Sequence, residues 1–192
     1  ADNVLLSTAL PISAGLLEGV ADDDYLQKLR RIRYLANVCM VLSLDRSLSD
    51  TYWLNVNDPG FPYVGVIEHT NFEPPSSYGG RHIVYLSKYL PPHHPMYTMS
   101  DAELVEFSIP HLQKMFPEFD RSWIQDLHVW RADYAQPIAE KHYSKLIPGR
   151  CTPISNVFVT SMAQVYPEDR GTNYAVREGR EVCAQILKTG RN

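Results

Sequence analysis

Residues 156–182 have the sequence NVFVTSMAQVYPEDRGTNYAVREGREV, which predicts a strand, a loop and a helix in that order. Val157 to Ser161 is a short apolar run, typical of a buried strand. A polar loop over residues 164–170 leads to Gly171, where the helix is expected to begin. A helix N-terminus carries unpaired N–H groups and a partial positive charge, so it favours an anionic or strongly polarised oxygen. Gly171 would let a ligand approach the backbone, although an ordinary strand, loop and glycine-capped helix explains the same spacing.

The helix after Gly171 is expected to bury one face, on which Gly179 would allow close packing against a neighbouring backbone. The residues expected on that face are Ala175, Gly179, Val182, Cys183 and Ile186. The residues expected to face away are Arg177, Glu178, Arg180, Glu181 and Gln185.

The first residues predict a buried strand at 4–8, followed by a turn at Pro11. A helix should follow over residues 22–33, because three aspartates stand at its start and four basic residues crowd its end. That charge distribution complements the helix macrodipole.

Residues 34–137 contain several runs in which apolar and polar residues alternate, the period of a half-buried strand. The runs are 34–44, 52–56, 62–70, 81–86 and 126–134. Ser100 and Glu103 form a capping box before an amphipathic helix, which Pro110 should kink or interrupt. Together the elements predict an α+β fold: a mixed, mainly antiparallel sheet of about six strands with helices packed on one side.

Composition argues against several classes of function. The formal net charge of -4 leaves no basic excess for nucleic acid, so no nucleic-acid binding is expected. No apolar run approaches the roughly 20 residues that a membrane span needs. Three scattered cysteines without a Cys-x-x-Cys pair indicate a reducing, cytoplasmic location. The adjacent His93 and His94 lack a third ligand at suitable spacing, so no metal site is expected.

Three segments resemble the flavin amine oxidase and protoporphyrinogen oxidase superfamily, and together they cover both ends of the chain. Residues 156–182 resemble its C-terminal FAD-binding segment. Residues 3–11, NVLLSTALP, resemble the strand by which the chain leaves the FAD domain. Residues 130–137, WRADYAQP, resemble the last strand of the substrate domain.

The resemblance implies FAD as the cofactor and a division of the chain by role. Residues 1–11 would be the strand leaving the FAD domain, 12–150 the substrate-binding domain, and 151–192 the C-terminal FAD-binding segment. No Gly-x-Gly-x-x-Gly motif follows a strand, so an N-terminal FAD domain of the same protein, absent here, would bind the nucleotide end.

The resemblance also implies the residues that contact FAD. Met162 and Ala163, with the adjacent Gln164, would meet the ribityl and phosphate region. Gly171, Thr172 and Asn173 would meet the isoalloxazine. The sequence departs from the family at residues 161–164, where Ser-Met-Ala-Gln replaces the usual Gly-Asp pair and its carboxylate. The lysine that many amine oxidases keep near flavin N5 has no identifiable counterpart.

Polar residues gather at two expected strand ends, which are common places for binding sites, although ordinary solvent-facing polarity gives the same pattern. Arg131 is the best candidate for an anionic substrate group, because its planar guanidinium suits a carboxylate or phosphate. No catalytic side chain is assigned, since the flavin carries the redox chemistry. The expected substrate contacts are Glu68, His69, Asn71, Arg131, Tyr134 and Gln136.

The resemblance therefore implies the substrate-binding portion of an FAD-dependent oxidoreductase of the amine oxidase type, which transfers hydride from a small organic substrate to flavin. The chain alone is expected to be inactive. A flavin-dependent sugar-nucleotide mutase and a non-catalytic binding module are the alternatives. Turnover without a change in flavin redox state would distinguish the mutase.

Overall fold

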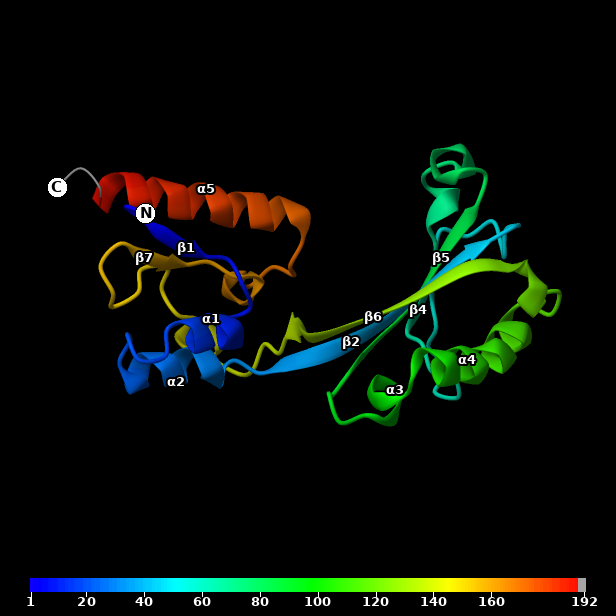
Figure 1. The fold of residues 1–192 in the computed structure, drawn as a ribbon, viewed down its shortest axis with the longest axis horizontal. Coiled ribbons are helices and arrows are strands. Elements are labelled where there is room, and N and C mark those ends of the chain that lie inside the picture. Colours follow the sequence, from blue (N-terminus) through cyan, green and yellow to red (C-terminus); the bar gives the residue numbers. More distant parts are fainter. Residues whose placement is uncertain (190–192) are drawn as a thin grey trace. The chain divides into compact units, whose positions relative to one another are not determined.

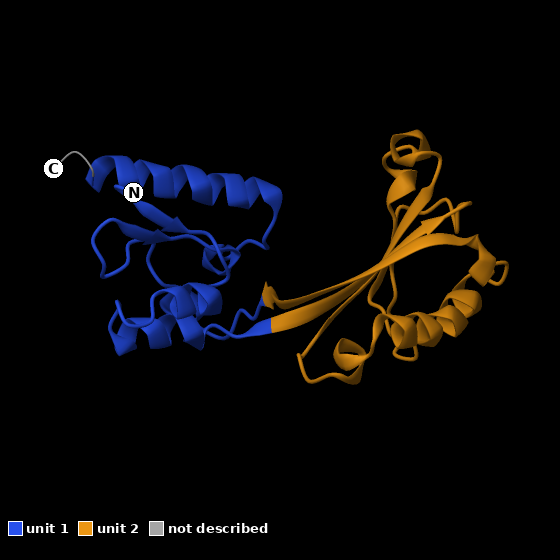
Figure 2. Cartoon of the chain, viewed as in Figure 1, with its two compact units in different colours: residues 1–34, 137–192 blue, residues 35–136 orange. Residues whose placement is uncertain are grey.

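The computed structural model describes residues 1–189, which form two compact units (Figure 1, Figure 2). Unit 1 contains residues 1–34 and the C-terminal part from residue 137, and unit 2 contains residues 35–136. Unit 2 is therefore one continuous insertion. The boundaries expected after residues 11 and 150 divide the chain by role. The compact units divide it differently, because residues 12–34 and 137–150 pack together with the two end segments in unit 1. Residues 190–192 of the expected FAD-binding segment lie outside the described residues.

Unit 2 is built on a five-stranded sheet with the order β3-β4-β5-β2-β6. Its strands are β2 (Tyr34–Leu44), β3 (Trp53–Asn55), β4 (Gly65–Glu68), β5 (His82–Leu90) and β6 (Ile124–Pro137). The pairs β2–β5, β3–β4 and β4–β5 are antiparallel. The predicted mixed, mainly antiparallel sheet is confirmed, with five strands here and two more in unit 1.

Two helices, α3 (Pro95–Thr98) and α4 (Asp101–Met115), cover one face of this sheet (Figure 1). The side chains of β2 that point toward them, from Ala36 to Leu44 at every second position, are at most 1% exposed. The alternate side chains of β2 are only partly buried. Packing of helices on one side is thus confirmed, and the opposite face of the sheet carries no helix of unit 2.

The predicted capping box at the start of α4 is confirmed, because Ser100 Oγ accepts the N–H of Glu103 and the Glu103 carboxylate accepts the N–H of Ser100. Pro110 was expected to kink or interrupt this helix; the interruption is wrong, and the kink stays a prediction. α4 continues to Met115, and Pro110 lies on its exposed side, where its ring has space and the unpaired carbonyl one turn earlier can reach water.

Short 3-10 turns replace several expected strand ends. β4 stops at Glu68 because η1 (His69–Asn71) follows at once, so the strand predicted over residues 62–70 is shorter than expected. The other turns in unit 2 are η2 (Pro75–Tyr78) and η3 (Arg121–Trp123).

Unit 1 combines a small parallel sheet with three helices. Its elements are β1 (Val4–Leu6), α1 (Leu10–Leu16), α2 (Asp23–Arg31), η4 (Tyr143–Lys145), β7 (Val157–Val159), η5 (Met162–Gln164) and α5 (Thr172–Thr189). β1 pairs with β7 in parallel, with Leu5 opposite Phe158. The helix predicted after Asp22 is confirmed, and Asp22 Oδ1 accepts the N–H of Tyr25 over 2.7 Å.

Two expectations for the start of unit 1 are corrected. The first strand is not buried, since Val4 is 43% and Leu5 39% exposed. The expected turn at Pro11 is instead the first turn of α1, where a proline is tolerated because the N–H that it lacks would have no intrahelical acceptor.

The predicted buried face of α5 is also corrected. Glu178 and Val182 are its buried residues, whereas Cys183 is exposed. Glu178 is buried because Arg150 pairs with it, a contact that sequence periodicity does not reveal. A Cβ added at Gly179 would meet no atom within 4 Å, so no backbone packs closely there.

Candidate functional site

The turn η5, which follows β7, is held by its own side chains. Ser161 Oγ accepts the N–H of Ala163, and Gln164 Oε1 accepts the N–H of Ser161 over 2.7 Å. Gln164 Nε2 donates to the carbonyl of Pro148, and Tyr143 Oη donates to the carbonyl of Ala163. Ala163 and Gln164 are buried, so they shape the turn, while Met162 remains partly exposed.

The N-terminus of α5 presents backbone donors. The first bond along the helix runs from the N–H of Ala175 to the carbonyl of Gly171, over 3.0 Å. The N–H groups of Thr172, Asn173 and Tyr174 consequently have no acceptor within the helix. A Cβ at Gly171 would lie 2.8 Å from Asn173 Oδ1, the end of an exposed side chain that would have to move aside.

The two-stranded sheet of unit 1 has one occupied edge and one open edge. On the far side of β7, the N–H of Val159 donates to the carbonyl of Arg150 and the N–H of Thr152 to that of Val157. The far side of β1 pairs with no strand among residues 1–189. Parallel strands normally occur inside larger, covered sheets, so β1 lies at an edge that can accept another strand.

The structure buries Glu68, which was expected at the substrate. Its carboxylate accepts the hydroxyl of Ser47 over 2.6 Å and the N–H groups of Leu48 and Ser49. Glu68 is 1% exposed. It therefore anchors the segment after β2 from within unit 2, and its geometry supports a structural role.

Arg131 likewise has partners inside unit 2. Its guanidinium donates to Asp101 over 2.6 Å and to the carbonyls of Met99 and Tyr97. These partners lie in or beside α3 and α4, so the side chain lies on the helix-covered face. This engagement supports a role in holding β6 to the helices rather than the expected contact with an anionic substrate.

The remaining expected substrate residues divide between two strands. His69 Nε2 lies 2.6 Å from Tyr78 Oη, and Asn71 Nδ2 donates to the carbonyl of Ser49. Tyr134 and Gln136 lie on β6, at positions that alternate with Arg131. His69 and Asn71 belong to η1, just beyond β4, and β5 and β2 separate β4 from β6, a sideways distance of about 14 Å at the usual strand spacing. The two groups also lie toward opposite ends of the sheet, because the N–H of Ile83 donates to Thr70 near one end and the N–H of Ile138 donates to the carbonyl of Arg33 near the other. They flank one sheet but do not form one cluster.

Sequence reasoning missed Tyr85 and Tyr89, which lie on the helix-free face of the same sheet. The ring of Tyr85 contacts that of His69, with centroids 5.9 Å apart. Burial and nearby Tyr78, Cys39 and Tyr52 raise the pKa of Tyr85. The signal was present, because residues 83–89 alternate, but the predicted strand ended at residue 86.

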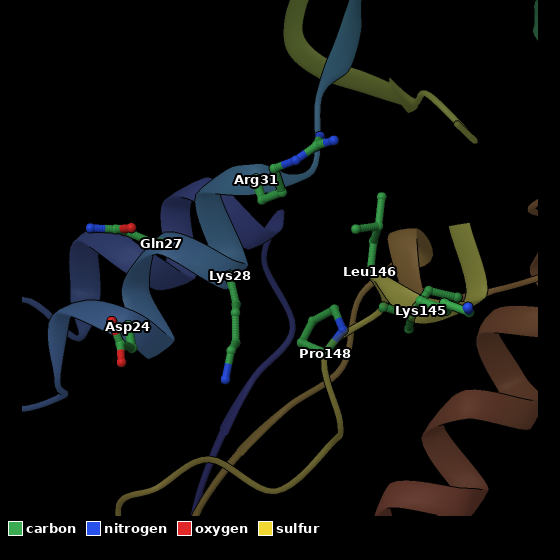
Figure 3. Close-up of a pocket in the computed structure, with 8 residues that line it drawn as sticks. Asp24, Gln27, Lys28, Arg31, Lys145, Leu146 and Pro148 are labelled. Atoms are coloured by element: carbon green, nitrogen blue, oxygen red, sulfur yellow. The ribbon is translucent and has the colours of Figure 1, made fainter. Parts of the chain in front are cut away.

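A pocket of about 470 Å³ lies in unit 1 between α2 and residues 145–148 (Figure 3). Lys28 and Arg31 project from α2, and Leu146 and Pro148 belong to the facing segment. Arg31 already donates both Nη atoms to Glu140. None of the expected contact residues lines this pocket.

Residues 1–189 contain neither a metal-binding cluster nor a membrane-spanning helix. No group of three or more His, Cys, Asp or Glu side chains in residues 1–189 could hold a metal ion. No helix in the same range has the length and apolar character needed to cross a membrane.

The sequence matches the family described as flavin containing amine oxidoreductase over residues 1–187. The chain belongs to the flavin-containing amine oxidoreductases. A comparison with curated proteins found no match.

Solved structures resemble this amine oxidoreductase chain in fold. A protein from Exiguobacterium sp. 255-15, assigned as a protoporphyrinogen oxidase, aligns with 98% of the chain at a TM-score of 0.70 and 14% identity. An oxidoreductase from Methanosarcina mazei aligns with all of it at a TM-score of 0.64 and 16% identity. A reduced UDP-galactopyranose mutase aligns with 76% at a TM-score of 0.56 and 11% identity.

The amine oxidoreductase chain spans less than half the length of these structures: the matched shares of the three are 42%, 43% and 32%.

The residues of unit 1 fit a flavin at one place in particular. The unpaired N–H groups at the start of α5 suit a polarised carbonyl oxygen, such as a flavin ring carries. At η5, the partly exposed Met162 fits a contact with the cofactor, whereas Gln164 is fully engaged in the turn.

Proposed function

We propose that this chain is the substrate-binding portion, with two flavin-contacting end segments, of an FAD-dependent oxidoreductase that removes hydride from a small organic substrate. The observation that carries the proposal is the family match over residues 1–187, together with the backbone donors at the N-terminus of α5. The chain alone should be inactive.

The proposed roles follow from the positions of the residues. The N–H groups of Thr172 and Asn173, beside Gly171, would donate to the flavin pyrimidine carbonyl, and Met162 would contact the ribityl region, with Ala163 and Gln164 holding that turn. FAD, when bound, would supply the electron acceptor for hydride. The chain's own residues would orient the substrate and exclude water from it.

We further propose that an N-terminal FAD domain of the same protein completes the cofactor site. Two observations support this partner: the open edge of β1 can accept a strand, and relatives of this fold are more than twice as long as the matched part. Three free cysteines support a reducing, cytoplasmic setting.

The substrate would lie against the helix-free face of the sheet in unit 2. Of the expected contacts, His69, which touches Tyr85, and Tyr134 and Gln136, which alternate with Arg131, would border that face, whereas Glu68 and Arg131 would support it from behind. Asn71, whose side chain donates to the carbonyl of Ser49, would lie beside His69 in η1.

The test is the visible absorption spectrum of protein produced from the full reading frame. We expect oxidised-flavin bands that dithionite bleaches, and release of FAD, identified by mass, on denaturation. A colourless full-length protein that does not take up added FAD would refute the proposal. Turnover without net flavin reduction would instead favour the sugar-nucleotide mutase alternative.

A further inference from the structure

The helix-free face of the unit 2 sheet, here called the open face, has a defined set of side chains. Directly opposed residues on antiparallel strands point to the same side, so the pairing of β2 with β5 places their partly exposed residues together. The central pairs are Cys39 with Ser87, Val41 with Tyr85, and Asn37 with Tyr89. Asn37 Nδ2 also donates to Ser87 Oγ over 3.0 Å.

Large aromatic side chains border this neutral centre. Trp130 on β6 is 65% exposed, and Tyr134 is 42% exposed. Both alternate with Arg131 and Asp133, which bond groups of the helix-covered side, so both belong to the open face. Trp53 on β3 is 55% exposed and is paired with Ile67, which shares the side of Tyr85.

The open face carries almost no charge. The charged residues of the central strands, such as Lys88 and Glu68, stand at positions paired with Val38 and Val84 on the buried side. Among the strand positions of the open face, Asp126 is the one Asp, Glu, Lys or Arg, and it lies near the first residue of β6, 3.3 Å from His128.

We propose that the open face binds a planar, uncharged aromatic or conjugated substrate. This inference rests on the proposed function and deepens it. Aromatic side chains and β-branched residues offer stacking and dispersion contacts, while Asn37 and Ser87 offer neutral hydrogen-bonding groups.

Electrostatics decides against charged substrates. An ammonium ion would gain cation–π attraction from the tryptophans and tyrosines, but it would lose hydration without a carboxylate at the centre of the face to compensate. A diphosphate or carboxylate would meet no cation there, because Lys88 and Arg131 lie on the other side. The neutral molecule is the one that loses least hydration on binding.

The test uses the full-length flavoprotein and three probes of one shape: 2-naphthylmethanol, 2-naphthylmethylamine and 2-naphthoate. Dissociation constants are measured by calorimetry and by quenching of tryptophan fluorescence. We expect the neutral alcohol to bind at least about tenfold more tightly than either ion, because each ion would lose hydration of its charge without gaining a partner of opposite charge.

Variants locate the binding. Trp130→Ala should weaken the alcohol about tenfold, whereas Phe107→Ala, which removes a 37% exposed ring on α4, should change nothing. Ser87→Asp keeps an acceptor for Asn37 and should shift the preference to the amine.

The inference would be overturned if one of the ions bound the unaltered protein most tightly, or if Trp130→Ala changed the affinity of none of the probes. It would also be overturned if Trp130→Ala changed the oligomeric mass and left probe binding intact. The last would identify the open face as an interface with a second copy. The flavin spectrum is recorded on the same samples, so loss of flavin refutes the proposed function while tryptophan quenching still reports on the face.

Discussion

Arg150 donates through Nη2 to the carboxylate of Glu178 over 2.5 Å, and Glu178 is only 5% exposed. The pair joins the segment that leads into β7 to the middle of α5. It explains why a charged residue occupies the buried side of that helix.

Removing one partner of this pair should destabilise unit 1. Arg150→Met leaves the buried carboxylate of Glu178 with the more distant Arg177, whose Nε lies 3.6 Å away, and should lower the free energy of unfolding by about 3 kcal/mol. Glu181→Gln is the control, because Glu181 contacts the same guanidinium but is 48% exposed, and it should lower stability by less than about 1 kcal/mol. Urea titration measures both, and equal effects would contradict the assignment.

Glu68 should be essential to the order of residues 47–49. Glu68→Gln replaces an acceptor with a donor facing a backbone N–H, so we expect a loss of about 2 to 3 kcal/mol. Hydrogen exchange should show faster opening of the amides of Leu48 and Ser49. Glu73→Gln is the matched control, because Glu73 is only partly buried and its carboxylate accepts from the Ser77 hydroxyl. If it has the same effect, burial of Glu68 is not the cause.

The glycine before α5 and the glycine within it should respond in opposite ways to alanine. Gly171→Ala adds a Cβ beside the backbone donors at the start of α5, where the flavin would approach, and should reduce the flavin content of the full-length protein severalfold. Gly179→Ala has free space and should stabilise the helix by up to about 1 kcal/mol with flavin content unchanged. The ratio of flavin to protein absorbance measures the effect, and normal flavin content in Gly171→Ala would exclude a role for this turn.

Alkaline pH should destabilise both units. Burial raises the pKa of Tyr63 and of Tyr143 to about 12, against 10.0 for an unperturbed tyrosine. Because the folded pKa is the higher one, the stabilisation is complete below pH 10 and disappears as pH rises toward 12, by about 2 kcal/mol per residue. Denaturation midpoints at pH 8 and pH 11.5 should therefore differ less in Tyr63→Phe than in the exposed control Tyr166→Phe.

Pro110→Ala should stabilise α4. The helix already runs through this position, so alanine restores one intrahelical hydrogen bond without moving the backbone. We expect a gain of about 1 to 2 kcal/mol after the larger entropy of the unfolded chain is subtracted. A rise of the thermal midpoint measures it, and a fall would mean that the ring packs favourably.

Local patterns predicted the elements that depend on local physics. The alternation of residues 34–44 and the capping box at Ser100 predicted β2 and the start of α4 within one or two residues. The errors arose where contacts with residues distant in the sequence determine burial or strand pairing. Nothing near Glu178 in the sequence indicates that Arg150 will neutralise it, and nothing near Val4 indicates that β1 lies at an open edge.

The features of the candidate site were likewise predictable only where they depend on neighbouring residues in the sequence. Gly171 and the helix after it could be located from spacing alone, because glycine and helix capping are local effects. Glu68 and Arg131 looked like surface polarity because the partners that engage them, Ser49 and Asp101, lie 19 and 30 residues away in the chain. Only the fold brings those partners together.

The insertion of unit 2 between residues 34 and 137 has a consequence for how such proteins can change. The N–H of Ile138 donates to the carbonyl of Arg33, so unit 1 closes upon itself at the point where the chain departs and returns. For the folding of unit 1, residues 35–136 act as a loop whose two ends are held together by this hydrogen bond. The entropy cost of closing a loop rises only logarithmically with its length. A lineage could therefore exchange or enlarge the inserted sheet while unit 1 keeps its own stability.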